Sequence, residues 1–282
     1  MNRLLAAVIA CAMLAAASGC SVREYALRSM GDALADGGDV YASDEDIDLV
    51  GAATPFGLKT IESLLAEVPD HRGLLLAAAR GFTQYAYVYV QLPAEEVMER
   101  DVAQGYAQQA RARRLYLRAR DYGLRGLKLA PDDVGLLYWT AVSWAAAISL
   151  SKDDPATLAG LPSVDKLIRR AERLEPDYDH GTLRTFLIGY EVNRPNAGAD
   201  AEALARAHFA RAVQLSGGRQ AGPYVSLAEV CIEKRERREF EALLRQALAV
   251  DPGARPEWRL ANLVMQRRAR AMLARADELF PE

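Results

Sequence analysis

Apolar residues recur at intervals of three or four positions along most of this 282-residue chain. The clearest such face is formed by Phe240, Leu243, Leu244, Ala247 and Leu248. This spacing gathers side chains on one face of an α-helix, whereas a half-buried strand alternates with period two. Because no long stretch alternates in that way, the sequence predicts an all-α fold.

Proline and glycine interrupt the helical pattern at regular points. The signals that end helices are Val68-Pro69, Leu129-Ala130-Pro131, Leu174-Glu175-Pro176, Leu215-Ser216-Gly217 and Val250-Asp251-Pro252. From Pro69 onward the breaking residues are 62, 45, 41 and 35 positions apart. The last interval is close to the tetratricopeptide period of about 34 residues. We therefore expect an array of helical hairpins with degenerate tetratricopeptide-like repeats.

Proline, glycine and capping residues also predict where individual helices begin and end. Thr54 and Pro55 suggest an N-cap followed by proline in the first turn, and Leu92-Pro93 suggests a helix end. Two separate helices are expected after it, over 95–109 and 111–129. Ser216-Gly217-Gly218 lacks the spacing and the lysine of a phosphate-binding loop, so a helix stop at Gly217 and a restart at Gly222-Pro223 is favoured.

The first 19 residues have the features of a processed signal. Arg3 precedes an apolar run from Leu4 to Ala17, and Ala17-Ser18-Gly19-Cys20 resembles a bacterial lipobox. We predict a lipoprotein signal peptide at residues 1–19, lipidation of Cys20, an anchored segment at residues 20–44 and one helical domain at residues 45–282. An ordinary signal peptide with an incidental cysteine and an uncleaved anchor remain alternatives. The segment after Cys20 is expected to supply slack, with one short helix at 22–35.

Charge and cysteine content narrow the class of protein. The formal net charge is −3, or −4 without Arg3, so the basic excess of a nucleic-acid-binding protein is missing. Cys231 would be the remaining free thiol, and it shares a helical face with Leu227 and Ala228, which predicts a buried apolar role. The histidines form no metal-binding pattern, and no nucleophile motif of a hydrolase occurs. We expect no cofactor, no metal and no enzymatic activity.

Several segments stand out in a fixed order along the chain. They are Pro55-Phe56-Gly57-Leu58-Lys59 with Glu62-Ser63-Leu64-Leu65, then Gly81-Phe82-Thr83-Gln84-Tyr85-Ala86-Tyr87, Leu115-Tyr116-Leu117-Arg118-Ala119-Arg120-Asp121-Tyr122, Leu137-Tyr138-Trp139-Thr140, and the stretch 208–240. Together they resemble the TatT component family of periplasmic lipoproteins associated with TRAP transporters. The similarity spans most of residues 45–280.

This resemblance implies a lipid-anchored protein that docks the periplasmic solute-binding subunit of a TRAP transporter. It further implies a homotrimer with a pore that conducts or receives a small ligand. Ser21 after Cys20 resembles lipoproteins sorted to the outer membrane. A different hypothesis is an envelope scaffold or chaperone-like lipoprotein that assembles other proteins through the same surface.

Aromatic and polar residues on the expected concave face are the candidates for binding a ligand or partner. Tyr85, Tyr87 and Tyr89 cannot all share one helical face, so one of them is expected in the core. The candidate residues are Tyr85, Tyr89, Trp139, Tyr190, Asn193, Tyr224, Glu229, Asn262 and Gln266.

Overall fold

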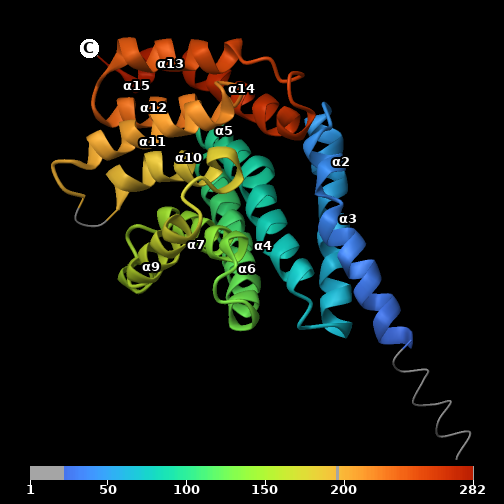
Figure 1. The fold of residues 1–282 in the computed structure, drawn as a ribbon. Coiled ribbons are helices and arrows are strands. Elements are labelled where there is room, and N and C mark those ends of the chain that lie inside the picture. Colours follow the sequence, from blue (N-terminus) through green and yellow to red (C-terminus); the bar gives the residue numbers. More distant parts are fainter. Residues whose placement is uncertain (1–21, 195–196, 282) are drawn as a thin grey trace, which may run out of the picture.

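The computed structural model describes residues 22–194 and 197–281 (Figure 1). The predicted signal peptide and Cys20 lie outside these residues. All regular elements in the described part are helical, which confirms the all-α prediction. After a helix over 22–36 they are α2 (Gly38–Ala42), α3 (Ile47–Glu67), α4 (Arg72–Ala86), the π-helix η1 (Tyr87–Gln91), α5 (Leu92–Met98), α6 (Val102–Leu129), α7 (Val134–Ser149), α8 (Pro155–Leu158), α9 (Leu161–Leu174), α10 (Tyr178–Asn193), α11 (Ala201–Ser216), α12 (Gly222–Glu233), α13 (Arg237–Ala249), the 3₁₀-helix η2 (Pro256–Trp258), α14 (Arg259–Ala274) and α15 (Ala276–Leu279).

Neighbouring helices in the sequence pack against one another, and the two ends of the array meet. The most extensive helix–helix contacts include those of α4 with α6, of α6 with α7, of α10 with α11 and of α12 with α13. Apolar clusters lie between them, around Leu75 and Phe82 near the N-terminus and around Leu227 and Phe240 near the C-terminus. At the far end α14 returns to α2, where Arg259 donates to the carbonyl of Ser43 at 3.1 Å (Figure 1). The array therefore curves around an interior space, while its tetratricopeptide character stays a prediction.

The expected start of α3 at Thr54 and Pro55 is wrong. The helix begins seven residues before Thr54, at Ile47, because the side chain of Asp46 accepts hydrogen bonds from the N–H groups of Asp48 and Leu49. Pro55 lies inside the helix, where the hydroxyl of Thr54 donates to the carbonyl of Val50 at 2.6 Å. The aspartate cap and the packing of α3 on α4 outweigh the cost of an internal proline.

The expected helix end at Leu92-Pro93 is also wrong. A π turn over Tyr87–Gln91 connects α4 to α5, and Pro93 occupies the first turn of α5, where its missing N–H costs little. The two helices expected over 95–109 and 111–129 are instead α5 and the single long helix α6. Asp101 caps the start of α6 by accepting from the N–H of Gln104 at 2.9 Å.

The described part of the predicted anchor segment packs onto the body. The helix over 22–36 places Arg28 against Asp70 at 2.8 Å and lets the carbonyl of Arg28 lie 3.0 Å from His71 Nε2. Leu27 joins the apolar cluster of α3 and α4. Residues 22–36 therefore supply little of the slack expected after Cys20, because their contacts fix them against the α3–α4 turn.

The glycine-rich break after α11 has the predicted structure. Gly217 and Gly218 have φ values of 59° and 71°, and the N–H of Gly218 reaches back to the carbonyl of Val213 at 2.9 Å. This is the left-handed helix end that glycine allows without a Cβ penalty. Gly222 and Pro223 then start α12. The interpretation as a helix stop and restart is confirmed.

A buried carboxylate joins α9, α10 and α11. Glu191 is 1% exposed, and it accepts from Arg194 Nε at 2.7 Å and from Arg169 Nη2 at 2.5 Å. His208 Nε2 lies 3.8 Å from the same carboxylate, and His208 Nδ1 lies 3.2 Å from Arg184 Nη1. Burial by itself raises the pKa of Glu191, but His208 and the two arginines together lower it to about 2.

Candidate functional site

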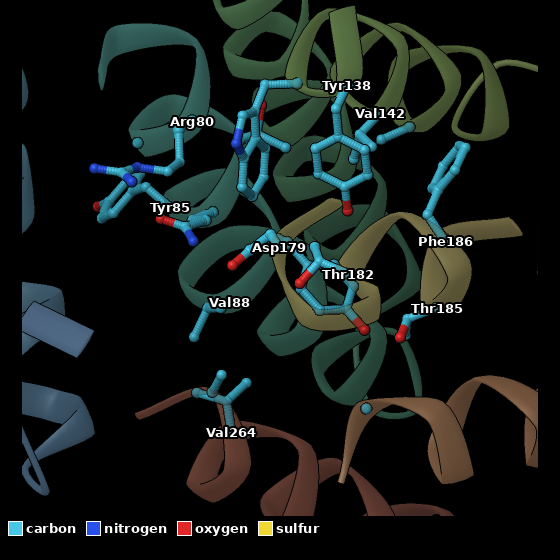
Figure 2. A pocket seen from close by; sticks show the side chains of 18 of the residues that line it. Arg80, Tyr85, Val88, Tyr138, Val142, Asp179, Thr182, Thr185, Phe186 and Val264 are labelled. Atoms are coloured by element: carbon cyan, nitrogen blue, oxygen red, sulfur yellow. The ribbon is translucent and has the colours of Figure 1, made fainter. Parts of the chain in front are cut away.

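The helices enclose one large cavity of about 1910 Å³ on the inner side of the curve. Its lining comes from distant parts of the chain: α2 to α4 and η1, then α7, α10, α12 and α14. Ligand pockets commonly measure about 300–1,000 Å³, so this space exceeds the needs of a small molecule. Figure 2 shows a part of it, with side chains from several helices pointing inward.

Aromatic rings of α7 and α10 form a continuous wall. Tyr138 lies edge-on to Trp139 with ring centroids 5.0 Å apart, and it also meets Tyr178 at 5.6 Å and Phe186 at 6.2 Å. Phe186 in turn stacks on Tyr190 at 5.5 Å. The start of α7 is fixed by Asp133, whose side chain accepts from the N–H of Leu136 at 3.0 Å. This cap sets the helical register that turns Tyr138 inward.

The π turn contributes a second group of tyrosines. Tyr85 and Tyr89 lie four residues apart, with ring centroids separated by 5.5 Å. The hydroxyl of Tyr89 donates to the carbonyl of Ile47 at 2.9 Å, and burial raises its pKa to about 12. Tyr87 lies toward α14, 6.0 Å from the guanidinium of Arg268. All three contribute to the cavity lining, and Tyr87 also packs against the apolar cluster around Val90 and Tyr116, as expected for the one of them that lies in the core.

The entry to α10 is a left-handed turn. Asp179, His180 and Gly181 have φ values of 49°, 52° and 98°, a conformation that is costly for residues with a Cβ. His180 lies edge-on to Trp258 at 5.6 Å, and both line the cavity. The turn places the Asp179 carboxylate on the cavity side of α10, as Figure 2 shows, next to the aromatic wall.

Polar residues of α12 and α14 mainly serve the backbone and one another. Asn262 accepts from the N–H of Ala221 and donates to the carbonyl of Arg219, both at 2.9 Å. Gln266 donates to the carbonyl of Val250 at 2.7 Å, at the end of α13. Glu229 accepts from Arg268 Nε at 2.7 Å. These contacts pair polar groups that would otherwise lie buried without partners.

The structure brings seven of the nine predicted binding residues to the cavity. They are Tyr85, Tyr89, Trp139, Tyr190, Asn193, Glu229 and Asn262. Gln266 is buried beneath α13, and Tyr224 packs edge-on against Phe209 at 5.6 Å, so neither lines the cavity. Both residues lie on helices that line the cavity, but their side chains lie on other faces of those helices. A binding role for the seven stays a prediction.

Sequence reasoning missed Tyr138, Tyr178, Asp179 and Phe186, which line the same wall. One local signal was present, because Tyr138 precedes the candidate Trp139 in an apolar helix. Asp179 gave no usable signal, because aspartate and histidine adopt the left-handed conformation more often than most residues but still in only a small share of cases.

One group of potential metal ligands comes together among the described residues. Atoms of Cys231, Glu236 and Glu239 lie within 4.8 Å of one another. However, Arg206 pairs with both glutamates, at 3.1 Å and 2.5 Å, and burial raises the pKa of the Cys231 thiol to about 12. Because a thiolate is the form that binds metals, this arrangement suits the predicted buried apolar role of Cys231 better than a metal site.

None of the described helices combines the length and the apolar character that a membrane crossing requires.

Comparison with known proteins places the chain. Residues 43–132 and 128–280 match the family described as TRAP transporter T-component. The chain is also 28% identical over 302 residues to an uncharacterized protein of Treponema pallidum (strain Nichols), with 93% of this chain and 94% of the relative covered. The two family matches together cover most of the chain and include the helices that enclose the cavity. The chain thus belongs to the TRAP transporter T-component family.

Proposed function

We propose that this T-component is a non-enzymatic protein that docks the periplasmic solute-binding subunit of a TRAP transporter and receives a small ligand in its cavity. The observation that carries the proposal is the aromatic cavity of about 1910 Å³ in a member of this family. Rings from α7, α10 and η1 offer apolar faces to a ligand, and the polar groups between them fix its orientation. The size of the space leaves room for a ligand to enter and leave.

A lipid at Cys20 would hold the protein at the outer membrane, facing the periplasm. The helix over 22–36 begins two positions after Cys20 and packs onto α3 and α4. The anchor would therefore keep the α3–α4 turn near the bilayer. Labelling with a radioactive fatty acid tests this part, and a Cys20→Ala variant that still carries the label would contradict it.

Copurification tests the docking. The mature chain without lipid is mixed with the TRAP solute-binding protein of the same organism, and an unrelated periplasmic binding protein serves as the control. We expect a complex only with the TRAP subunit. No association with it at concentrations up to about 100 μM, where even weak transient complexes form, would refute docking.

Assembly is measured separately. Sedimentation equilibrium of the mature chain is expected to give a homotrimer, and a monomer throughout would remove a trimer pore. Crosslinking in intact cells distinguishes the scaffold alternative, since assembly machinery would then be captured in place of the solute-binding subunit.

A further inference from the structure

Tyr138 combines deep burial with an unused hydroxyl. The ring is buried and the residue is 5% exposed, while its hydroxyl is open to the cavity and makes no hydrogen bond to any residue within 22–194 or 197–281. Figure 2 shows the hydroxyl pointing into the cavity, away from the helix that carries it. Two tyrosines of the cavity are paired, since Tyr190 donates to Asp165 at 3.1 Å and Tyr89 donates to the carbonyl of Ile47. Tyr178, next to Tyr138 on this wall, shares its lack of a hydroxyl partner within the described residues.

The ring alone does not explain a tyrosine at this position. A phenylalanine would keep the contacts with Trp139, Tyr178 and Phe186, but it would remove the hydroxyl that this wall presents to the cavity. Burial, with Asp179 and Tyr178 nearby, raises the pKa of Tyr138, so its hydroxyl remains a hydrogen-bond donor. The position therefore supplies a donor for something that enters the cavity.

An acceptor lies on the same side. Asp179 makes no ion pair or side-chain hydrogen bond within the described residues, and the left-handed turn brings it to the cavity near Tyr138 (Figure 2). Thr182, one turn later on α10, adds a hydroxyl that can donate or accept. Strained backbone persists where the surrounding structure enforces it, and such sites gather at ligand contacts.

These groups discriminate between classes of head group. An anion would meet the Tyr138 hydroxyl favourably, and Arg80 also lines this part of the cavity. However, the charged group that acts on Tyr138 itself is the Asp179 carboxylate, which would repel an anion bound to this hydroxyl. An ammonium would suit Asp179 and the aromatic rings, yet it would leave the Tyr138 hydroxyl without an acceptor. A hydroxyl group satisfies both, because its oxygen accepts from Tyr138 and its proton goes to Asp179.

We propose that the α7–α10 wall binds a neutral, hydroxyl-bearing molecule with an apolar body, with Tyr138 as donor and Asp179 as acceptor for the ligand hydroxyl. The aromatic rings of this wall contact the apolar body. The proposal rests on the proposed function only in assigning the ligand to this cavity, so binding to the purified chain is measured without any transporter subunit. A failure of docking and a failure of this site are therefore separate results.

Three probes that share one apolar tail test the head group. Binding of 1-octanol, octanoate and octylammonium is measured by titration calorimetry at pH 7, below the micelle concentration of each. We expect 1-octanol to bind most tightly. Tighter binding of octanoate or of octylammonium, or no binding of 1-octanol up to its solubility, would overturn the assignment.

Two matched Tyr→Phe variants separate binding from folding. Tyr138→Phe is expected to weaken 1-octanol binding about 5- to 10-fold, the effect of one lost hydrogen bond, without lowering Tm. Tyr116→Phe loses the bond from its hydroxyl to Gln91 Oε1 at 2.7 Å, and it is expected to lower Tm without changing 1-octanol affinity. Unchanged 1-octanol affinity in Tyr138→Phe would contradict the proposal, as would a fall in Tm.

Asp179→Asn tests the acceptor. Asparagine tolerates the left-handed conformation, so the turn is retained. We expect octylammonium binding to weaken and octanoate binding to strengthen, while 1-octanol keeps an acceptor in the amide oxygen. Unchanged affinities for both octylammonium and octanoate would show that Asp179 does not face the ligand.

Discussion

Two walls of the cavity differ in whether their polar side chains have hydrogen-bond partners in the protein. On the α12–α14 wall, the amide of Asn262 bonds to the backbone at Arg219 and Ala221. On the α7–α10 wall, the Tyr138 hydroxyl and the Asp179 carboxylate have no such partner in the described chain. The two walls therefore differ in whether their polar groups are already used, although both are rich in residues that commonly bind ligands.

This difference separates residues that support the fold from residues free to act on a ligand. A buried polar group that is paired stabilises one arrangement of helices, and removing it leaves its partner unpaired. A polar group that faces the cavity without a protein partner contributes no such pairing to the fold. Stability and ligand affinity should therefore respond to different substitutions.

The largest effect on stability is expected at Glu191. Replacement by alanine leaves the guanidinium groups of Arg169 and Arg194 without their buried partner, and breaking such a pair costs about 3–5 kcal/mol. Urea denaturation followed by circular dichroism measures the loss. Asp277→Ala is the control, because Asp277 is 90% exposed in its pair with Arg237, and we expect a change below about 1 kcal/mol. Equal losses in both variants would refute a special role for Glu191.

Stability should also depend on the ionisation of Glu191. Its pKa is about 2 in the folded protein and 4.5 ordinarily, so the unfolded chain takes up the proton first. The contribution of Glu191, at most about 3 kcal/mol, is then complete above pH 4.5 and disappears as the pH falls toward 2. Measurement of the free energy of unfolding from pH 6 to pH 2.5 tests this. Glu191→Gln should flatten the profile in this window, and parallel profiles would contradict the assignment.

Asn262 should affect folding and leave binding unchanged. Asn262→Ala leaves the N–H of Ala221 and the carbonyl of Arg219 unpaired, which costs about 1–3 kcal/mol. We expect a lower Tm with unchanged 1-octanol affinity at a temperature where the variant is folded. A variant with normal Tm but weakened binding would mean that this wall also binds the ligand.

Much of the fold follows from local patterns in the sequence. The ends at Val68-Pro69 and Leu215-Gly217 are correct because proline and glycine act on the backbone within a few residues. The helix ends predicted from Pro55 and Pro93 are wrong. Pro55 is tolerated inside α3 because the Asp46 cap starts this helix further upstream, and Pro93 follows a π turn that carries the helix past it. The sequence does not reveal which of two local signals prevails, because tertiary packing decides it.

The cavity was less predictable than the helices. Tyr138 and Tyr190 lie on one wall although they are 52 positions apart in the sequence, and only the packing of α7 and α10 brings them together. Aromatic residues identify faces of helices, but the partner of each face depends on the whole array. The unused hydroxyl of Tyr138 depends on every neighbour within hydrogen-bonding distance, so no local pattern reports it.

The smallest effect is expected at Tyr224, which appeared as promising as its neighbours in the sequence. Tyr224→Phe removes one hydroxyl, the same chemical change as Tyr138→Phe, but its ring packs on Phe209 and lies outside the cavity lining. We expect the free energy of unfolding to change by less than about 0.5 kcal/mol. Calorimetric titration should give the same 1-octanol affinity as the unaltered chain. If Tyr224→Phe weakened binding as much as Tyr138→Phe, loss of any hydroxyl near the helices would suffice, and the distinction between used and unused polar groups would fail.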